Sequence, residues 1–166
     1  MKHNAMPIYA QTERTDLQCT REEAWKLISV VEGWAGAGLV AESESVGAGA
    51  SAPQYKIKLL GGGGTQVINV TSKDNDKCAL AYEVVSGLDL GLTSLKGEIK
   101  VYDGVTIEWS AEATAMFGLE TAFKCQIGNA IRAKLDEMLA GFEAGLRRGG
   151  GGGVLAAAAS SKTGAQ

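Results

Sequence analysis

Few residues in this sequence belong to types that carry out chemistry in groups. The chain has one histidine, His3, in an N-terminal stretch that we expect to be loosely held. The folded body is therefore expected to contain neither a Ser-His-Asp triad nor a Cys-His pair. No Cys/His cluster has the spacing of a zinc site. The glycine run Gly61–Gly64 lacks the lysine and the following helix of a phosphate-binding loop. We expect no metal and no cofactor, and we interpret the glycine run as a hairpin turn.

The first single acid–base candidate is Tyr82, whose surroundings depend on the register of a predicted hairpin. If Asn75-Asp76 forms a two-residue loop, Tyr82 lies opposite Asn69, and Val84 lies opposite Val67. A buried tyrosine hydroxyl needs a hydrogen-bond partner. Two roles remain open for Tyr82: a hydrogen bond to Asn69 in the core, or contact with a ligand.

The second candidate is Glu108, whose position depends on the length of the turn at Asp103-Gly104. A two-residue loop would place Glu108 on the face of Ile99, in the interior. Burial there would raise the pKa of the carboxyl and let it act as an acid. A three-residue loop would align Trp109 with Ile99 and give one apolar and one charged face. We prefer the three-residue loop, which makes Trp109 a pocket or core residue; the two-residue loop stays open as the arrangement that supplies a catalytic Glu108.

Hydrophobic periodicity indicates the elements that position these residues. Thr20 and Glu23 form a capping box at the start of a short helix. Glycines at 33, 36 and 38 end that helix and allow a second short one around Trp34. The period then changes to two, with turn signals between the segments. The predicted strands are Ile8–Leu17, Leu39–Val46, Gln54–Leu60, Thr65–Ser72, Cys78–Ser86, Leu95–Tyr102 and Val105–Phe117.

A long amphipathic helix is predicted from Leu119 to Arg148, because its apolar residues recur at spacings of three and four. One face of an antiparallel sheet needs a cover, and this helix is the only element available to provide it. The order of elements predicts an α+β fold in which a curved seven-stranded antiparallel sheet surrounds one long helix, with a cavity between them. The helix-side wall of that cavity is expected to be Phe117, Phe123, Ile127, Ile131 and Met138.

Three stretches of the sequence resemble the START-like superfamily, also called SRPBCC. They are Ala24–Ile28 with Trp34 behind it, Gly62–Gly87, and Thr106–Ser110 leading into the final helix. The resemblance implies the helix-grip fold, with a hydrophobic pocket for a lipid, a polyketide or another small organic molecule. By the family pattern, the face that carries Tyr82 points inward. Some members are cyclases, dehydratases or isomerases, and many only bind.

The sequence departs from the hormone-receptor members of that superfamily. The predicted strand at 39–46 carries no lysine, and Leu88-Asp89-Leu90 stands where those members have His-Arg-Leu. A receptor for a carboxylate hormone is therefore not expected. The residues expected to contact a ligand are Asn69, Tyr82, Val84, Trp109, Phe117, Phe123, Ile127 and Ile131.

Composition narrows the classes of function. The chain has 166 residues, a net charge of −3 and a pI of about 5.2, with Lys and Arg scattered along it. A nucleic-acid partner is therefore not expected. No run of about 18 apolar residues is present to span a membrane, and three widely spaced cysteines do not make a disulfide framework. We expect a cytoplasmic protein with one domain over residues 8–148 and a disordered Gly/Ala-rich tail over residues 149–166.

Three functions are compatible with these features. The preferred one is binding of a small hydrophobic molecule in the internal cavity. The alternative is an enzyme of the polyketide cyclase, dehydratase or isomerase type, which needs only shape and one or two acid–base groups, with Tyr82 and Glu108 as candidates. The third is an interaction module, which a large exposed apolar patch would indicate.

Overall fold

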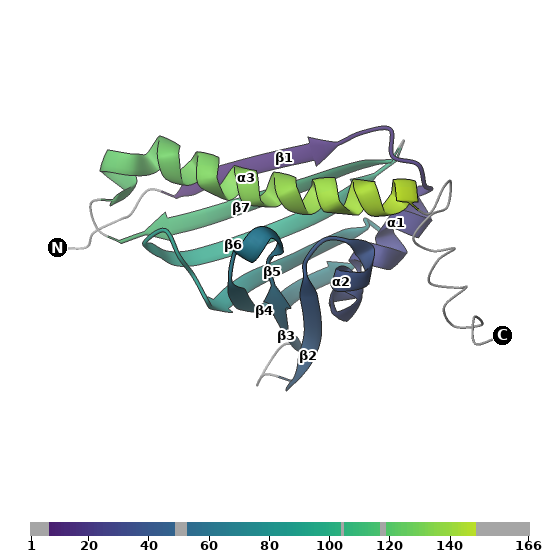
Figure 1. Cartoon of the computed structure of the whole chain (residues 1–166), viewed down its shortest axis with the longest axis horizontal. Helices are drawn as coiled ribbons and strands as arrows, with labels where there is room; N and C mark the ends of the chain where they lie inside the picture. The colour runs from purple at the N-terminus through teal and green to yellow at the C-terminus, as the bar shows by residue number, and fades with distance from the viewer. Residues whose placement is uncertain (1–6, 49–52, 104, 117–118, 149–166) are drawn as a thin grey trace.

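The computed structural model describes residues 7–48, 53–103, 105–116 and 119–148. The predictions that concern His3, Phe117 and the tail after residue 148 lie outside these residues. Figure 1 shows the arrangement of the elements. In chain order they are β1 (Ile8–Arg14), α1 (Arg21–Ile28), a 3-10 turn (Val31–Gly33), α2 (Trp34–Ala37), β2 (Glu42–Ala48), β3 (Pro53–Lys58), a second 3-10 turn (Leu60–Gly62), β4 (Thr65–Asp74), β5 (Ala79–Ser86), β6 (Leu92–Tyr102), β7 (Thr106–Ala115) and α3 (Leu119–Arg148).

The seven strands form one antiparallel sheet in the order β1-β7-β6-β5-β4-β3-β2. The long helix α3 crosses one face of this sheet and packs mainly on β1 and β7, while α1 and α2 lie at the end of the sheet where α3 ends (Figure 1). An antiparallel sheet with one covered face and one exposed face alternates buried and exposed residues, as β1 does from Ile8 to Glu13. The α+β helix-grip prediction is confirmed.

The short helices begin and pack as their sequence indicates. The capping box at α1 is complete: the Thr20 hydroxyl accepts from the backbone N–H of Glu23, and the Glu23 carboxylate accepts from the backbone N–H of Thr20. Gly38 follows α2 with φ of 89°, and a Cβ there would lie 2.5 Å from the carbonyl oxygen of Gly141 in α3. The two glycines therefore let α2 and α3 approach at backbone contact.

The hairpin between β6 and β7 has the preferred three-residue loop. Tyr102 pairs with Thr106, and Ile99 pairs with Trp109. Trp109 is fully buried on the inner face of the sheet, and the neighbouring Glu108 therefore lies on the outer face. Val105 takes the left-handed conformation, with φ of 55°. The alternative that placed Glu108 in the interior is wrong, because it would have put charged residues on the buried face of β7.

The predicted two-residue loop between β4 and β5 is also wrong. Four residues, 75–78, separate the paired residues Asp74 and Ala79, and the Asp74 carboxylate accepts from two backbone N–H groups inside the loop. A register shift between Val70 and Ser72 follows, so Tyr82 pairs with Val70 instead of Asn69. Asn69 consequently lies on the outer face, away from Tyr82.

The apolar stripe of α3 faces the sheet over most of its length. Ile127, Ile131, Leu135, Met138 and further positions down to Leu146 are buried. Phe123 departs from this pattern, since its side chain is 48% exposed and its backbone is non-helical at φ of −130°. The expectation that Phe123 forms part of the inner wall is therefore wrong: the kink rotates it off the stripe.

Candidate functional site

A narrow apolar cleft lies between α3 and the sheet, beside the segment that joins β5 to β6. It encloses about 30 Å³. Most of its lining side chains are buried and aliphatic. The aliphatic lining residues of β3, β6 and α3 include Ile57, Leu92, Ile131, Leu135 and Met138.

Polar side chains meet this cleft at three places. Gln66 of β4 lies opposite Ile57 of β3, is 8% exposed and lines the cleft. Tyr82 of β5 contributes its hydroxyl-bearing ring. Lys134 of α3 and Asp89 of the 87–91 segment line the cleft as an ion pair with a nitrogen–oxygen distance of 2.6 Å, and both are partly exposed. The cleft thus combines an apolar wall, two neutral polar groups and one charge pair joining the 87–91 segment to the helix.

Three aromatic rings fill the interior next to the cleft. Tyr82 accepts a hydrogen bond from the indole N–H of Trp109 at 3.0 Å, and its ring meets Trp109 and Trp34 edge to face, with centroids 6.4 and 6.2 Å away. Burial raises the pKa of Tyr82 to about 12, although the Trp109 hydrogen bond acts in the opposite direction. At neutral pH the hydroxyl is therefore protonated, and it can donate a proton or a hydrogen bond but cannot act as a base.

The aromatic cluster explains why the enclosed space is small. Gly97 of β6 leaves room for the Tyr82 ring, because a Cβ at residue 97 would lie 2.3 Å from the ring carbon that bears the hydroxyl. A cavity of about 30 Å³ holds about one water molecule, whereas a drug-sized ligand occupies roughly 300–1,000 Å³. Entry of such a ligand requires the cleft to widen. The 87–91 segment has the backbone for a rearrangement, with Gly87, Leu90 and Gly91 all at positive φ.

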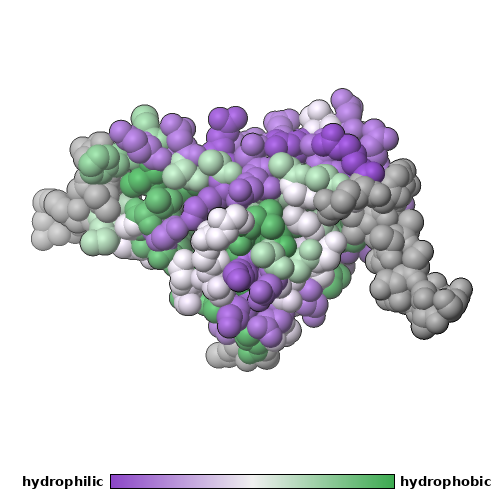
Figure 2. Space-filling model, viewed as in Figure 1, coloured by the Kyte–Doolittle hydropathy of each residue, from purple (hydrophilic) through white to green (hydrophobic). Residues whose placement is uncertain are grey.

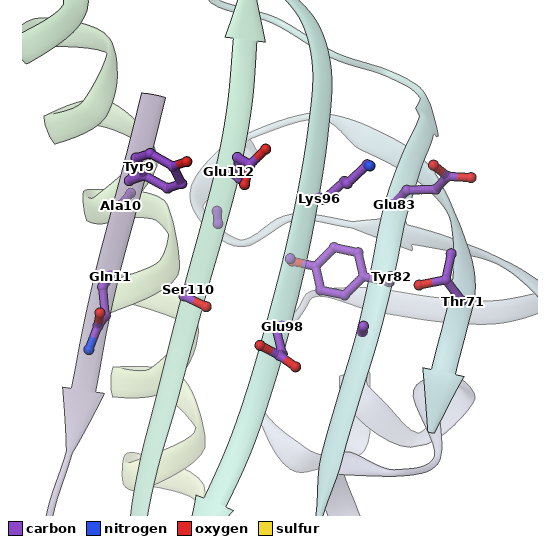
Figure 3. A pocket seen from close by; sticks show the side chains of 13 residues that line it. Tyr9, Ala10, Gln11, Thr71, Tyr82, Glu83, Lys96, Glu98, Ser110 and Glu112 are labelled. Atoms are coloured by element: carbon purple, nitrogen blue, oxygen red, sulfur yellow. The ribbon is translucent and has the colours of Figure 1, made fainter. Parts of the chain in front are cut away.

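A second and larger hollow lies on the outer face of the sheet, away from α3. It measures about 610 Å³, is open to solvent, and crosses β1, β7, β6, β5 and β4. Figure 3 shows side chains of both charges spread across it, among them Lys96, Glu98, Glu83 and Glu112, with Tyr9 at one edge. Water reaches these charges, so the hollow is a charged trough on a sheet surface and lacks the apolar enclosure of a small-molecule pocket.

Asn69, which was expected to contact a ligand, and Glu108, the acid candidate of the alternative loop, both belong to the outer face. Glu108 accepts hydrogen bonds from the Gln11 amide at 2.8 Å and from the Tyr102 hydroxyl at 3.1 Å, both at exposed positions. Asn69 pairs in register with Glu83 of β5, and its side-chain oxygen is buried without a hydrogen-bond partner among the described residues. Neither residue reaches the inner cleft.

The inner cleft brings together only part of the predicted set. Tyr82 and Ile131 line it, and Trp109 lies behind Tyr82. Val84 and Ile127 are buried on the inner side without lining the cleft.

Sequence reasoning missed Gln66 and the Asp89–Lys134 pair. The signal for Gln66 was its alternation with Ile68 on β4, which the wrong hairpin register turned to the outer face.

The described residues give no sign of a metal site or of a membrane-crossing helix. Within residues 7–148, apart from the undescribed gaps, no three His, Cys, Asp or Glu side chains gather as a metal-binding group. None of the described helices is both long enough and apolar enough to cross a bilayer. Exposed large apolar residues of the described ranges are separated along the sequence, as Tyr9, Val46 and Val85 illustrate. In the view of Figure 2, polar and apolar side chains are mixed over much of the surface.

Comparison with known proteins identifies the fold. No family model matches the sequence, and no curated protein matches it, but many solved structures match the fold. A norcoclaurine synthase point mutant from Thalictrum flavum is 15% identical, with a TM-score of 0.64 over 86% of this chain and 95% of that chain. XoxI from Bacillus cereus is 13% identical, with a TM-score of 0.66 over 82% and 93%.

A third similar structure is a two-domain protein of a biosynthetic pathway. The di-domain ARO/CYC BexL from the BE-7585A biosynthetic pathway is 12% identical, with a TM-score of 0.61 over 83% of this chain. The match covers 45% of BexL, about half of that two-domain chain. These structures show the fold: the chain has the helix-grip fold that its resemblance to the START-like superfamily implied.

Proposed function

We propose that this protein binds a small hydrophobic molecule in the cleft between the sheet and α3. The observation that carries the proposal is the cleft itself, in which the neutral side chain of Gln66, a residue 8% exposed, stands among buried aliphatic side chains. A primary amide both donates and accepts hydrogen bonds, so Gln66 can pair with a polar group of a molecule bound there. The norcoclaurine synthase of the same fold has been solved with dopamine and hydroxybenzaldehyde, which supports a small-molecule role for this architecture.

In this proposal the ligand widens the cleft at the 87–91 segment. Leu90 lines the cleft while remaining 39% exposed, so it covers the cleft from the solvent side. Asp89 holds the segment to Lys134 of α3 through the 2.6 Å ion pair. An exposed ion pair of this kind contributes little to stability, and opening it therefore costs little. The ligand would then contact Tyr82 and Ile131, with Trp109, Val84 and Ile127 around them.

An acid-catalysed reaction of the cyclase, dehydratase or isomerase type is the second candidate. It is favoured by Tyr82, a residue of the cleft whose hydroxyl, within the described part of the chain, makes only the hydrogen bond that it accepts from Trp109. Its pKa of about 12 keeps the proton available for donation. In that case Tyr82→Phe would abolish turnover while leaving the affinity for the bound molecule within about threefold.

Titration with Nile red, a neutral dye whose fluorescence rises in apolar surroundings, tests the binding proposal. Leu90→Asp removes a lining side chain and places a carboxylate at the cleft, and aspartate tolerates the left-handed conformation at this position. Because burying a leucine is worth about 1.5–3 kcal/mol, we expect the dye affinity to fall at least about tenfold. Val30→Asp changes a similarly exposed apolar residue away from the cleft and should leave the affinity unchanged.

A third variant separates the cleft from the outer trough. Ser110→Trp fills part of the trough without touching the cleft. Dye binding that survives Leu90→Asp and is lost in Ser110→Trp would assign the ligand to the outer face and refute the proposal. The proposal would also be refuted if the fluorescence of Nile red did not rise at any concentration of wild-type protein.

A further inference from the structure

We infer that the molecule held in the cleft is uncharged and carries one neutral oxygen or amide group that pairs with Gln66. This inference rests on the proposed function and adds the chemical class of the ligand. It excludes carboxylates, phosphates and ammonium compounds, which many hydrophobic ligands carry at one end.

The position of Gln66 supplies the first argument. Its side chain lies on the inner face of β4, in register with the buried Ile57, and it is more than nine-tenths buried. A primary amide both donates and accepts hydrogen bonds but has no charge. It can therefore satisfy a hydroxyl, carbonyl or amide group of a ligand, whereas it does not offset the cost of taking an ionised group out of water.

The charges beside the cleft supply the second argument. Among the described residues that line it, only Asp89 and Lys134 are charged, and they neutralise each other at 2.6 Å. An anionic ligand would have to take Lys134 from its partner and would leave the Asp89 carboxylate beside its own charge. A cationic ligand would have to take Asp89 from its partner and would leave the Lys134 ammonium beside its own charge. The electrostatics of the cleft thus act against either sign.

Tyr82 supplies the third argument. Its hydroxyl oxygen already accepts from the Trp109 indole at 3.0 Å, so the group that it can offer to a ligand is its proton. A hydroxyl or carbonyl oxygen can accept from the Tyr82 hydroxyl, from the Gln66 amide, or from both, since these two residues line the same cleft. The arrangement fits a phenol, an alcohol, a ketone or an amide on an apolar body.

A matched set of naphthalenes tests this specificity, with affinities measured by displacement of Nile red at neutral pH. The probes are naphthalene, 2-naphthol, 2-naphthamide and 2-naphthoate, which share one ring system and differ in the polar group. We expect 2-naphthol and 2-naphthamide to bind at least about tenfold tighter than both naphthalene and 2-naphthoate, because only they can pair with a buried neutral amide without burying a charge.

Two variants locate the effect. Gln66→Met keeps the length of the side chain and removes its polar group, and it should reduce the preference for 2-naphthol over naphthalene to about twofold or less while naphthalene still binds. Because methionine has a similar volume and length, the variant should also stay within about 1.5 kcal/mol of the wild type in urea. Gln54→Met, on the outward side of β3, is the control and should leave every affinity unchanged.

The outcomes separate this inference from the proposed function. If Nile red binds but 2-naphthoate competes as well as 2-naphthol, or if 2-naphthol is no better than naphthalene, the specificity inference is overturned and cleft binding stands. An unchanged preference in Gln66→Met likewise overturns the role of Gln66. If Nile red itself does not bind, the proposed function is overturned and this inference with it.

Discussion

Removing the Tyr82 hydroxyl should destabilise the protein, because the indole N–H of Trp109 then has no hydrogen-bond acceptor. Tyr82→Phe keeps the ring, so no cavity forms, but the Trp109 N–H loses its acceptor at 3.0 Å while remaining fully buried. An unsatisfied buried donor costs about 1–3 kcal/mol. For a chain of this size that free energy corresponds to a fall in melting temperature of roughly 2–12 °C. Urea titration followed by tryptophan fluorescence, with a thermal melt, measures both quantities.

The matched control is Tyr102→Phe, which removes a hydroxyl that donates to Glu108 at 3.1 Å on an exposed face. Water replaces that bond, and we expect a change within about 0.5 kcal/mol. The double variant Tyr82→Phe with Trp109→Phe lacks both partners, so its destabilisation should fall short of the sum of the single variants by about 1 kcal/mol. Equal stability of Tyr82→Phe and Tyr102→Phe, or additivity in the double variant, would refute the reasoning.

Three further perturbations follow from local geometry. Gly97→Ala should cost about 1–3 kcal/mol because its Cβ would overlap the Tyr82 ring, whereas Gly36→Ala, with nothing within 4 Å of the new Cβ, should be neutral or stabilising; urea titration that shows equal effects would contradict this. Thr20→Ala removes the cap of α1 and should cost about 1 kcal/mol, and an unchanged urea midpoint would count against the capping box. Hydrogen bonds from Arg14 and then Thr12 hold the pKa of Asp136 below its usual value. Its contribution to stability is therefore present above about pH 4 and lost as the pH falls towards the lowered folded-state pKa. Acid titration should show a smaller loss in Asp136→Asn than in the wild type, and identical acid profiles would show that the ion pair has no such role.

The turn between β6 and β7 shows where sequence reasoning succeeds. Of the two possible loop lengths, one gives a face of Ile107, Trp109 and Ala111 next to Ile99, and the other would bury glutamates. The structure has the first. A choice between two registers is decidable from sequence when one of them would bury charges without partners.

The turn between β4 and β5 shows where it fails. Both faces of β4 carry apolar and polar residues, so alternation did not decide the register, and the actual loop depends on backbone hydrogen bonds to Asp74 and on a bulge near Val70. The inward direction of Tyr82 was nevertheless right, because it was taken from the pattern of the similar family and did not depend on the register of this hairpin. The wrong register placed Gln66 on the outer face, so the sequence did not identify the polar group on which the proposed site depends.

Long-range packing explains the remaining difference in the site. The indole N–H of Trp34 donates to the Ile28 carbonyl at 2.8 Å. Its ring also meets Tyr82 and Trp109, at centroid distances of 6.2 and 5.7 Å. No spacing in the sequence indicates that residues from a helix and two strands share one volume. The near-filling of the expected cavity was therefore not predictable from periodicity.

The pairing of β1 with β7 has a consequence for how the molecule is made. Ile8 at the start of the described chain pairs with Ala113, and Arg14 of β1 bonds to Asp136 of α3. During synthesis β1 therefore has no pairing strand until β7 has left the ribosome. The apolar inner face of the sheet stays uncovered until α3 has also been made. Closing so long a loop is entropically slow. Until then the nascent chain exposes apolar surface of the kind that chaperones recognise.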